Sequence, residues 1–479
     1  MAAKSSIVLQ TLVGLSICVP GDLECMTTYV LLEQEAWFEK EAEFANRCLS
    51  PGMTAIDVGA NYGVYCLPMA RAVGQTGRVV AYEPAAETAE LLDESRALND
   101  LGALAIVRRA LSNIQGQGVL VPGGVGSETN ALSAGPAHGG LGETVRVSTL
   151  DDERRRLELD DVDFIKIDAE GEESRIIEGA QKTLSQASPL VMFEISLREQ
   201  IDLRPIQALT GLGYDIYRLV GDGSMIVPWN GEPLDVWELN LFAAKPDRAR
   251  ALQTRGLLAT SPKPPMNLPG AWSVSVQDAT WLADLSIDMA AADQTLLAGL
   301  AAYDVWRNPV CPTNERYGAL ILAQEKLAAA VEARPNPERL STRARVAWAA
   351  GSRGLAMRCL GEILNARALP MSEVFLPASP RFDALPPQGR LQEWFLGAAL
   401  EQAEMLRAHS SYFSPSDINA LAWACRSPFV SPQIPRRLAL QAARDRHPIP
   451  TALYGLLMGS GHLNAHIMNP DRLMTLAVL

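Results

Sequence analysis

The chain has 479 residues, more than a single hydrophobic core usually serves, so we expect two or more domains. Hydrophobic residues make up 48% of it and charged residues 20%, as in ordinary globular proteins. The formal net charge of −13 disfavours nucleic acid as the main partner, and no apolar run reaches the ~18 residues that cross a membrane. Seven scattered cysteines without a CxxC pair favour a reducing, cytoplasmic location.

The first half of the chain alternates between strand patterns and helix patterns. One or two strands are expected within residues 5–19, followed by an amphipathic helix over 31–48. Such alternation predicts a largely parallel, doubly wound sheet covered on both faces. Residues 214–220 and 238–243 would add an antiparallel edge to this sheet. The glycine-rich residues 116–142 are expected to form a surface loop or a hairpin. The main strands are expected from residue 54 and at 78–83, 104–110, 162–168 and 190–195.

The second half of the chain lacks strand patterns. Prolines and glycines at 246–270 are typical of a linker, and the residues beyond it follow helical periods. Most of the tryptophans lie in this half, which suggests a core of its own. Paired helices after Pro335 resemble a tetratricopeptide-type hairpin, although no period is sustained. The expected domains are therefore an α/β domain over 1–247, a linker over 248–270 and an all-α domain over 271–479.

A glycine-punctuated turn follows the first main strand, at Gly59, Asn61 and Gly63. A strand, such a turn and a helix N-terminus together form a device that binds nucleotides. A dinucleotide fingerprint needs Gly at the position of Asn61, so the spacing disfavours NAD or FAD and fits a cofactor without phosphates. Asp57 would fix the turn or reach the cofactor through water. Glu83, at the tip of the second strand, is placed to accept both hydroxyls of a ribose.

Carboxylates crowd the end of the fourth main strand. Lys166 shares a face with Asp168, and a buried lysine needs a partner, which predicts a pair between them. Ligands in such folds bind at the carboxyl ends of strands, so we expect Asp168 and Glu170 to be functional. Glu172 and Glu173 lie at a helix start, where capping is the simpler role.

Five motifs in order make the chain resemble the FkbM family of S-adenosylmethionine-dependent methyltransferases, over about residues 20–245. The resemblance implies a class I methyltransferase fold, Rossmann-like, and methylation of a hydroxyl on a sugar, glycan or related natural product. It also implies that Gly59, Asn61 and Gly63 line the methionine side of the cofactor, that Glu83 binds the ribose, and that Ala110 and Leu111 lie near the adenine. The motifs are Ile56–Gly63, Val80–Pro84, Thr149–Asp152, Ile165–Glu173 and Phe193–Glu194.

Methyl transfer to a hydroxyl requires alignment of the reactants and removal of a proton. The expected catalytic residues are Asp168, Glu170 and Glu194, with Lys166 orienting Asp168 or taking the proton. Alternatively, Asp168 and Glu194 belong to a set of oxygen ligands for Mg²⁺.

Other functions stay open at this point. The acceptor could instead be a nitrogen, or the protein could be a non-catalytic helical-repeat scaffold with a vestigial cofactor domain. The side chain of Asn61 disfavours an NAD-dependent oxidoreductase, because a dinucleotide fingerprint has glycine at that position. The expected partners are a hydroxylated small molecule or glycan, with no nucleic acid and no membrane. The helical domain would mediate self-association or protein contacts.

Overall fold

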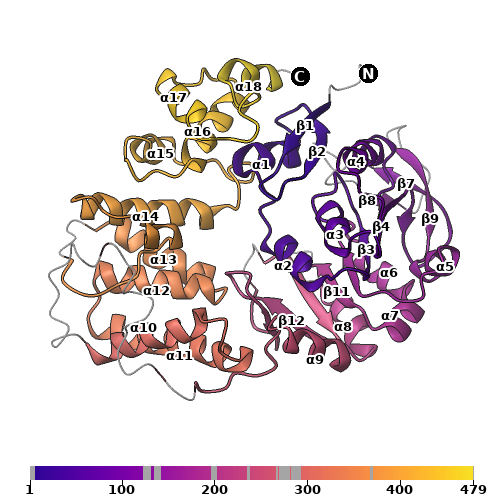
Figure 1. Ribbon diagram of the computed structural model, residues 1–479, viewed down its shortest axis with the longest axis horizontal. Coiled ribbons are helices and arrows are strands. Elements are labelled where there is room, and N and C mark those ends of the chain that lie inside the picture. The colour runs from indigo at the N-terminus through magenta and orange to yellow at the C-terminus, as the bar shows by residue number, and fades with distance from the viewer. Residues whose placement is uncertain are drawn as a thin grey trace. The chain divides into compact units, whose positions relative to one another are not determined.

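The computed structural model describes residues 6–121, 131–133, 142–195, 202–234, 238–265, 268, 281, 293–366 and 371–477. Strands and helices alternate in the first half of the chain, and within the described residues beyond Ala244 the named elements are helices (Figure 1). The chain forms two compact units. The first comprises Met1–Arg218, Pro228–Leu252 and Ala439–Leu479, and the second comprises Leu219–Val227 and Gln253–Leu438.

The main sheet has eight strands in the order β13-β12-β14-β11-β10-β3-β4-β5. Strands β11, β10, β3, β4 and β5 run parallel to one another, and β14 is antiparallel to β11 and β12. The predicted doubly wound, mostly parallel sheet with an antiparallel edge is therefore confirmed. The strands are β3 (Thr54–Val58), β4 (Arg78–Tyr82), β5 (Leu104–Val107), β10 (Phe164–Ile167), β11 (Leu190–Glu194), β12 (Asp215–Leu219), β13 (Ile226–Pro228) and β14 (Asn240–Ala244).

Helices cover the main sheet on both faces. One core cluster joins Ile56, Ile165 and Val191 of the strands to Ile176 and Leu184 of the helices behind them. Alternate strand residues face the other side, where α3 packs against β3, β4 and β5. The helices of this unit are α3 (Cys66–Val73), α4 (Ala86–Leu98), α5 (Leu150–Arg156), α6 (Glu173–Glu178), α7 (Gln181–Ala187), α8 (Arg204–Gly211) and α9 (Pro246–Thr254), the last of which occupies the start of the expected linker.

The N-terminal residues form a hairpin and two helices. Of the one or two strands expected there, the structure has two, β1 (Ser6–Gln10) and β2 (Ser16–Pro20), which pair antiparallel. The single helix expected over 31–48 is wrong, because α1 (Met26–Gln34) ends before α2 (Lys40–Cys48) begins. Glu35 ends α1 in the left-handed conformation, with φ of 59°.

A second, smaller sheet follows β5 and has the strand order β6-β9-β7-β8. Strands β7 and β9 pair antiparallel. The first residues of the glycine-rich segment 116–142 therefore form a strand, β7, of this sheet. The third main strand, expected to reach residue 110, ends at Val107, and Ala110 instead opens the second sheet. Its strands are β6 (Ala110–Leu111), β7 (Gly116–Val121), β8 (Ala131–Ser133) and β9 (Glu143–Ser148).

The second unit is helical and has the core that its tryptophans predict. Trp281, Trp306 and Trp394 are fully buried there, and Phe375 packs edge-on against Trp394. Successive helices from α10 to α14 pack against one another along the chain. The tetratricopeptide-type repeat stays a prediction. The helices are α10 (Gln294–Arg307), α11 (Thr313–Ala333), α12 (Pro337–Ala349), α13 (Arg353–Leu364), α14 (Leu391–Arg407) and α15 (Ile418–Ala424).

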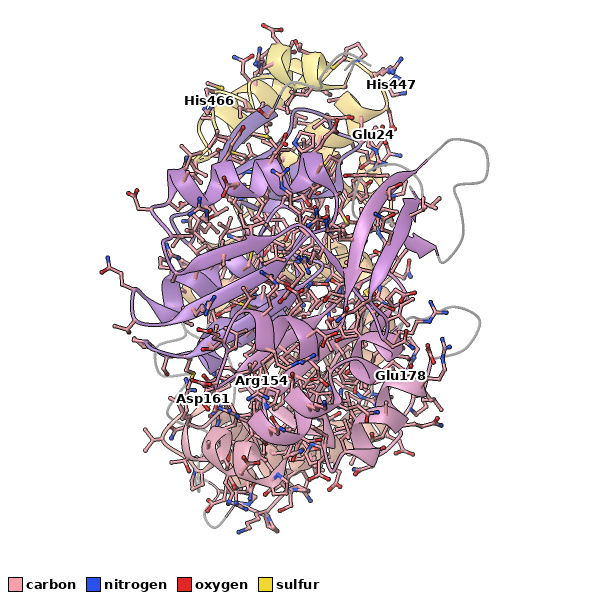
Figure 2. The ribbon with its side chains drawn as sticks, turned by 90° about the vertical axis from the view of Figure 1, so that its right-hand side faces the viewer. Glu24, Arg154, Asp161, Glu178, His447 and His466 are labelled. Atoms are coloured by element: carbon pink, nitrogen blue, oxygen red, sulfur yellow. The ribbon has the colours of Figure 1, made fainter. Side chains whose placement is uncertain are left out.

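The last residues of the chain differ from the expected domain division. The boundary between the two units falls within helix α16 (Gln433–Arg444), after Leu438. The described residues beyond it, 439–477, belong to the first unit and include α17 (Tyr454–Met458) and α18 (Pro470–Leu476). Arg444 pairs with Glu24 at 3.3 Å, and Glu24 lies beside the yellow C-terminal ribbon in Figure 2. In the part of the chain that the structure describes, no helix is both long and apolar enough to cross a membrane.

Candidate functional site

The carboxyl ends of β3 and β10 meet where the chain changes direction in the main sheet. From β3 the chain builds outward through β4 and β5, and it later returns to place β10 on the opposite side of β3. Such a switch point leaves a crevice beyond the strand ends, which is where ligands bind in open α/β sheets. The predicted site residues cluster there.

The glycine turn after β3 is shaped by its backbone. Gly59, Asn61 and Gly63 all have positive φ, at 79°, 46° and 89°. A Cβ on Gly59 would lie 1.8 Å from the backbone carbonyl oxygen of Asp168. Gly59 is therefore required both by its conformation and by the close approach of the chain that leaves β10. This contact joins the turn to the acidic strand end.

Glu83 connects the turn to the end of β4. Its Oε2 accepts a hydrogen bond from the backbone N–H of Asn61 and its Oε1 one from that of Ala85, both at 2.9 Å. Burial raises the pKa of Glu83 to about 7, although these two N–H groups oppose the shift. Each carboxylate oxygen keeps a second lone pair, so the group is still able to accept hydroxyl donors.

Lys166 lies between two carboxylates. Its Nζ is 3.0 Å from Oδ2 of Asp168, which confirms the predicted pair, and 3.5 Å from Oδ1 of Asp57 on the neighbouring strand. The ammonium also lies 4.9 Å from the ring centroid of Tyr65. Burial alone would lower the pKa of Lys166, but the charges of Asp168 and Asp57 outweigh it and hold that pKa above its usual value.

Asp57 is the buried member of this group. Its side chain has no exposed surface, and burial raises its pKa against the opposing charge of Lys166. Among the described residues, neither of its oxygens has a hydrogen-bond partner. Buried polar atoms are nearly always hydrogen-bonded, so these oxygens fit a site at which water or a cofactor supplies the missing donors.

Asp168 is the accessible member, with 34% of its side chain exposed. Glu170 follows it at φ of 50° and Gly171 at 98°, so the chain turns tightly beyond the strand. Glu173 secures this turn, because its Oε1 accepts the backbone N–H groups of Ala169 at 3.0 Å and Gly171 at 3.1 Å. These bonds agree with the structural role expected of Glu173.

Glu194 ends β11, beside β10. The register pairs Ile167 with Phe193, which brings Glu194 next to Asp168 at the strand ends. Burial, followed by the charges of Asp168, Glu170 and Glu173, raises the pKa of Glu194 to about 10. This shift favours the protonated form of Glu194, in which the carboxyl can donate a hydrogen bond.

The structure gives the magnesium hypothesis no support. Over the described residues, no three His, Cys, Asp or Glu side chains come together in a group that could hold a metal ion. The expected ligands Asp168 and Glu194 lie at adjacent strand ends without a third one. An Mg²⁺ ion held by these two carboxylates alone would take its remaining ligands from water or substrate.

Ala110 and Leu111 lie in β6, at the start of the second sheet. Ala110 packs in the same small apolar cluster as Ala85, two residues beyond Glu83, whereas Leu111 belongs to the main core. Ser112 follows them and donates its hydroxyl to Glu172 at 2.9 Å. Ala110 is thus close to the Glu83 end of the turn, and contact of either residue with an adenine stays a prediction.

Sequence reasoning missed Glu39, which lies in the connection between α1 and α2. Its Oε2 accepts hydrogen bonds from the Tyr65 hydroxyl at 2.5 Å and from the Trp37 indole at 3.0 Å. Burial raises the pKa of Glu39, and the charge of Asp168 adds to the shift. Trp37 and Glu39 lie within the single helix expected over 31–48. The sequence signal that could have indicated Glu39 is the order of residues 37–39, in which two aromatic side chains are followed by an acid.

Comparison with known proteins places this site in a family domain. Residues 57–216 match the family model of the methyltransferase FkbM domain. No curated protein matches the chain. Among solved structures, the chain is similar to a methyltransferase FkbM from Methylobacillus flagellatus KT, with 18% identity, a TM-score of 0.29, and coverage of 41% of this chain and 47% of that one.

Two further solved structures are similar to the chain at comparable levels. One is an S-adenosylmethionine-dependent O-methyltransferase from Thermotoga maritima, with 16% identity, a TM-score of 0.27, and coverage of 50% of this chain and 77% of that one. The other is an O-methyltransferase from Bacillus cereus in complex with S-adenosylhomocysteine, with 14% identity, a TM-score of 0.26, and coverage of 46% and 81%.

Proposed function

Because residues 57–216 match the family model of the methyltransferase FkbM domain, we propose that the protein transfers a methyl group from S-adenosylmethionine to a hydroxyl of a sugar, glycan or related natural-product acceptor. One observation carries the proposal. The glycine turn that would hold the cofactor packs directly against the chain leaving β10, through Gly59 and the Asp168 carbonyl. Cofactor-binding and acid–base groups thus belong to one continuous site.

The residues of the turn fit S-adenosylmethionine better than a dinucleotide. Asn61 carries a side chain where a pyrophosphate would need bare backbone. The Glu83 carboxylate would accept the ribose hydroxyls, and the Asp57 carboxylate, which Lys166 pairs at only 3.5 Å, would accept further donors from the methionine side. When bound, this cofactor supplies an electrophilic methyl group.

The acid–base work falls to Asp168. Of the carboxylates around Lys166 it is the exposed one, and the Lys166 ammonium holds it at 3.0 Å. An ammonium with a raised pKa has no lone pair to accept a proton, so Lys166 is a positioning residue and Asp168 the general base. In its protonated form Glu194 would donate a hydrogen bond to the acceptor, and Glu170 lies near enough for its charge to raise the pKa of Glu194.

Calorimetric titration tests the cofactor first. S-adenosylmethionine should bind the purified protein with a micromolar Kd and NAD⁺ should not. Glu83→Ala should weaken S-adenosylmethionine at least about tenfold, because a charged acceptor of two hydroxyls is lost. Failure of both cofactors to bind would favour the scaffold function instead.

Turnover on hydroxylated acceptors then tests the chemistry. Asp168→Asn should lower kcat about 10²- to 10⁴-fold, the usual contribution of a general base. The thermal midpoint of the variant establishes that it is folded. Wild-type turnover by Asp168→Asn would contradict the assignment, and equal rates with and without Mg²⁺ are expected.

A further inference from the structure

A second concave site is lined by the start of β7, by β9 and by α5, the helix marked by Arg154 in Figure 2. The cavity has a volume of about 520 Å³, within the range of ~300–1,000 Å³ that is usual for small-molecule sites. None of Asp57, Gly59, Glu83 and Asp168 lines it. Ala110 and Leu111 adjoin the cavity residue Arg109 in sequence, but neither of them contributes to the lining.

The lining of this cavity is positively charged in an acidic protein. Four arginines face it and only two carboxylates, which leaves a surplus of two positive charges, whereas the whole chain carries −13. Guanidinium groups stay charged at every physiological pH. The charged lining residues are Arg109, Arg146, Asp152, Glu153, Arg155 and Arg156.

Glu153 fixes two of the arginines in place. Its side chain is 1% exposed, and it accepts Nη1 of Arg109 at 2.8 Å on one oxygen and Nε of Arg156 at 3.0 Å on the other. One carboxylate neutralises only one of the two guanidiniums. The trio therefore carries a net positive charge, held by a buried anchor that limits the movement of both arginines.

Arg146 has no such partner. It is exposed on β9, between Val145 and Val147, which pack in the small apolar cluster on the opposite face. Within the described ranges, Arg146 forms no ion pair or side-chain hydrogen bond. Arg155, by contrast, is paired with Asp152. All five donors of the Arg146 guanidinium thus remain for a ligand at the cavity.

We propose that this cavity binds a phosphate-bearing small molecule, with Arg109, Arg146 and Arg156 as its donors. Arginine recognises phosphate oxygens through two parallel N–H bonds, and converging guanidiniums on a fixed frame are the usual form of such sites. The site is independent of the cofactor crevice, so it adds a ligand or effector beyond the methyl donor and its acceptor.

The test is calorimetric titration of the full-length protein with sodium pyrophosphate at low ionic strength, against sodium chloride at matched ionic strength. We expect saturable binding with a Kd of about 1 mM or lower. Arg146→Ala should raise the Kd at least about tenfold, and Arg146→Lys should give an intermediate value, because it keeps the charge but loses the planar fork.

Arg108→Ala is the matched control, since Arg108 is an exposed arginine of the same segment that pairs with Glu90 and does not line the cavity. It should keep the wild-type Kd. No saturation by about 10 mM pyrophosphate, or an equal loss in Arg146→Ala and Arg108→Ala, would overturn the proposal. Titration of S-adenosylmethionine into the same wild-type protein reports on the methyltransferase site separately, so the two proposals can fail independently.

Discussion

Lys166 illustrates at the scale of a single residue how much of the site follows from local pattern. Its spacing from Asp168 predicts their pair, because residues two apart in a strand share a face. Its second partner, Asp57, lies on another strand and is brought opposite Lys166 by the register of β3 and β10. That register depends on the whole sheet. The sequence therefore predicts one ion pair where the structure has a charge cluster.

Glu83 makes cofactor affinity depend on pH. Its pKa is raised to about 7, so the carboxyl is mostly protonated at pH 6 and mostly ionised at pH 8. Only the ionised form accepts two hydroxyl donors at full strength. The Kd of S-adenosylmethionine should therefore be up to about tenfold higher at pH 6 than at pH 8, as calorimetry at both values would measure.

Glu83→Gln provides the control for this dependence. The amide does not titrate, so the variant should bind the cofactor more weakly at pH 8 and with little change between pH 6 and pH 8. A wild-type Kd that is the same at both values would show that the ionisation of Glu83 does not govern binding.

At the scale of elements, the break between α1 and α2 is stabilised by residues far away in the sequence. Glu35 adopts φ of 59°, and its carboxylate accepts the backbone N–H of Leu463 at 2.6 Å. The imidazole Nε2 of His462 donates to the carbonyl of Leu32 at 2.8 Å. A helix period cannot reveal such contacts, which explains why one long helix is expected from the sequence. The break brings Glu39 to the candidate site.

Asn464 connects the C-terminal residues to the first hairpin. It is fully buried, its Oδ1 accepts the N–H of Gln10 at 2.7 Å, and its Nδ2 donates to the Gln10 carbonyl at 2.9 Å. Asn464→Ala leaves both backbone groups of Gln10 without these partners. The free energy of unfolding should fall by about 1–3 kcal/mol, measured by urea denaturation.

His466→Ala is the control for that variant, because His466 is exposed in the same segment and is labelled in Figure 2. It should change stability by less than about 0.5 kcal/mol. Equal stabilities of the Asn464 and His466 variants would mean that the Gln10 contact contributes nothing.

At the scale of the whole molecule, the chain returns to its first unit at its end. Residues 439–477 contribute buried side chains there, among them Leu440, Leu457 and Leu473 at 0–1% exposure. Each such side chain contributes about 1.5–3 kcal/mol through burial. The expected boundary at residue 271 would assign all of these residues to the helical domain.

A chain that ends at Leu438 should accordingly be less stable than the full chain. Removing the last segment exposes apolar surface on the first unit, so its Tm should fall by at least about 5 °C in a thermal melt. Residues 439–479 supplied as a separate peptide should restore part of the loss. An unchanged Tm would instead mean that residues 439–479 do not stabilise the first unit.

The sequence by itself determined the order of strands and helices, the glycine turn with Glu83, and the acidic end at Asp168. Each of these depends on neighbours within a few residues, through strand and helix periods or turn geometry. Only the tertiary structure decided which side chains meet. The pairing of Lys166 with Asp57, the approach of Glu39 to Tyr65 and the contact of Asn464 with Gln10 join distant segments, and long-range packing leaves no periodic pattern in a single sequence.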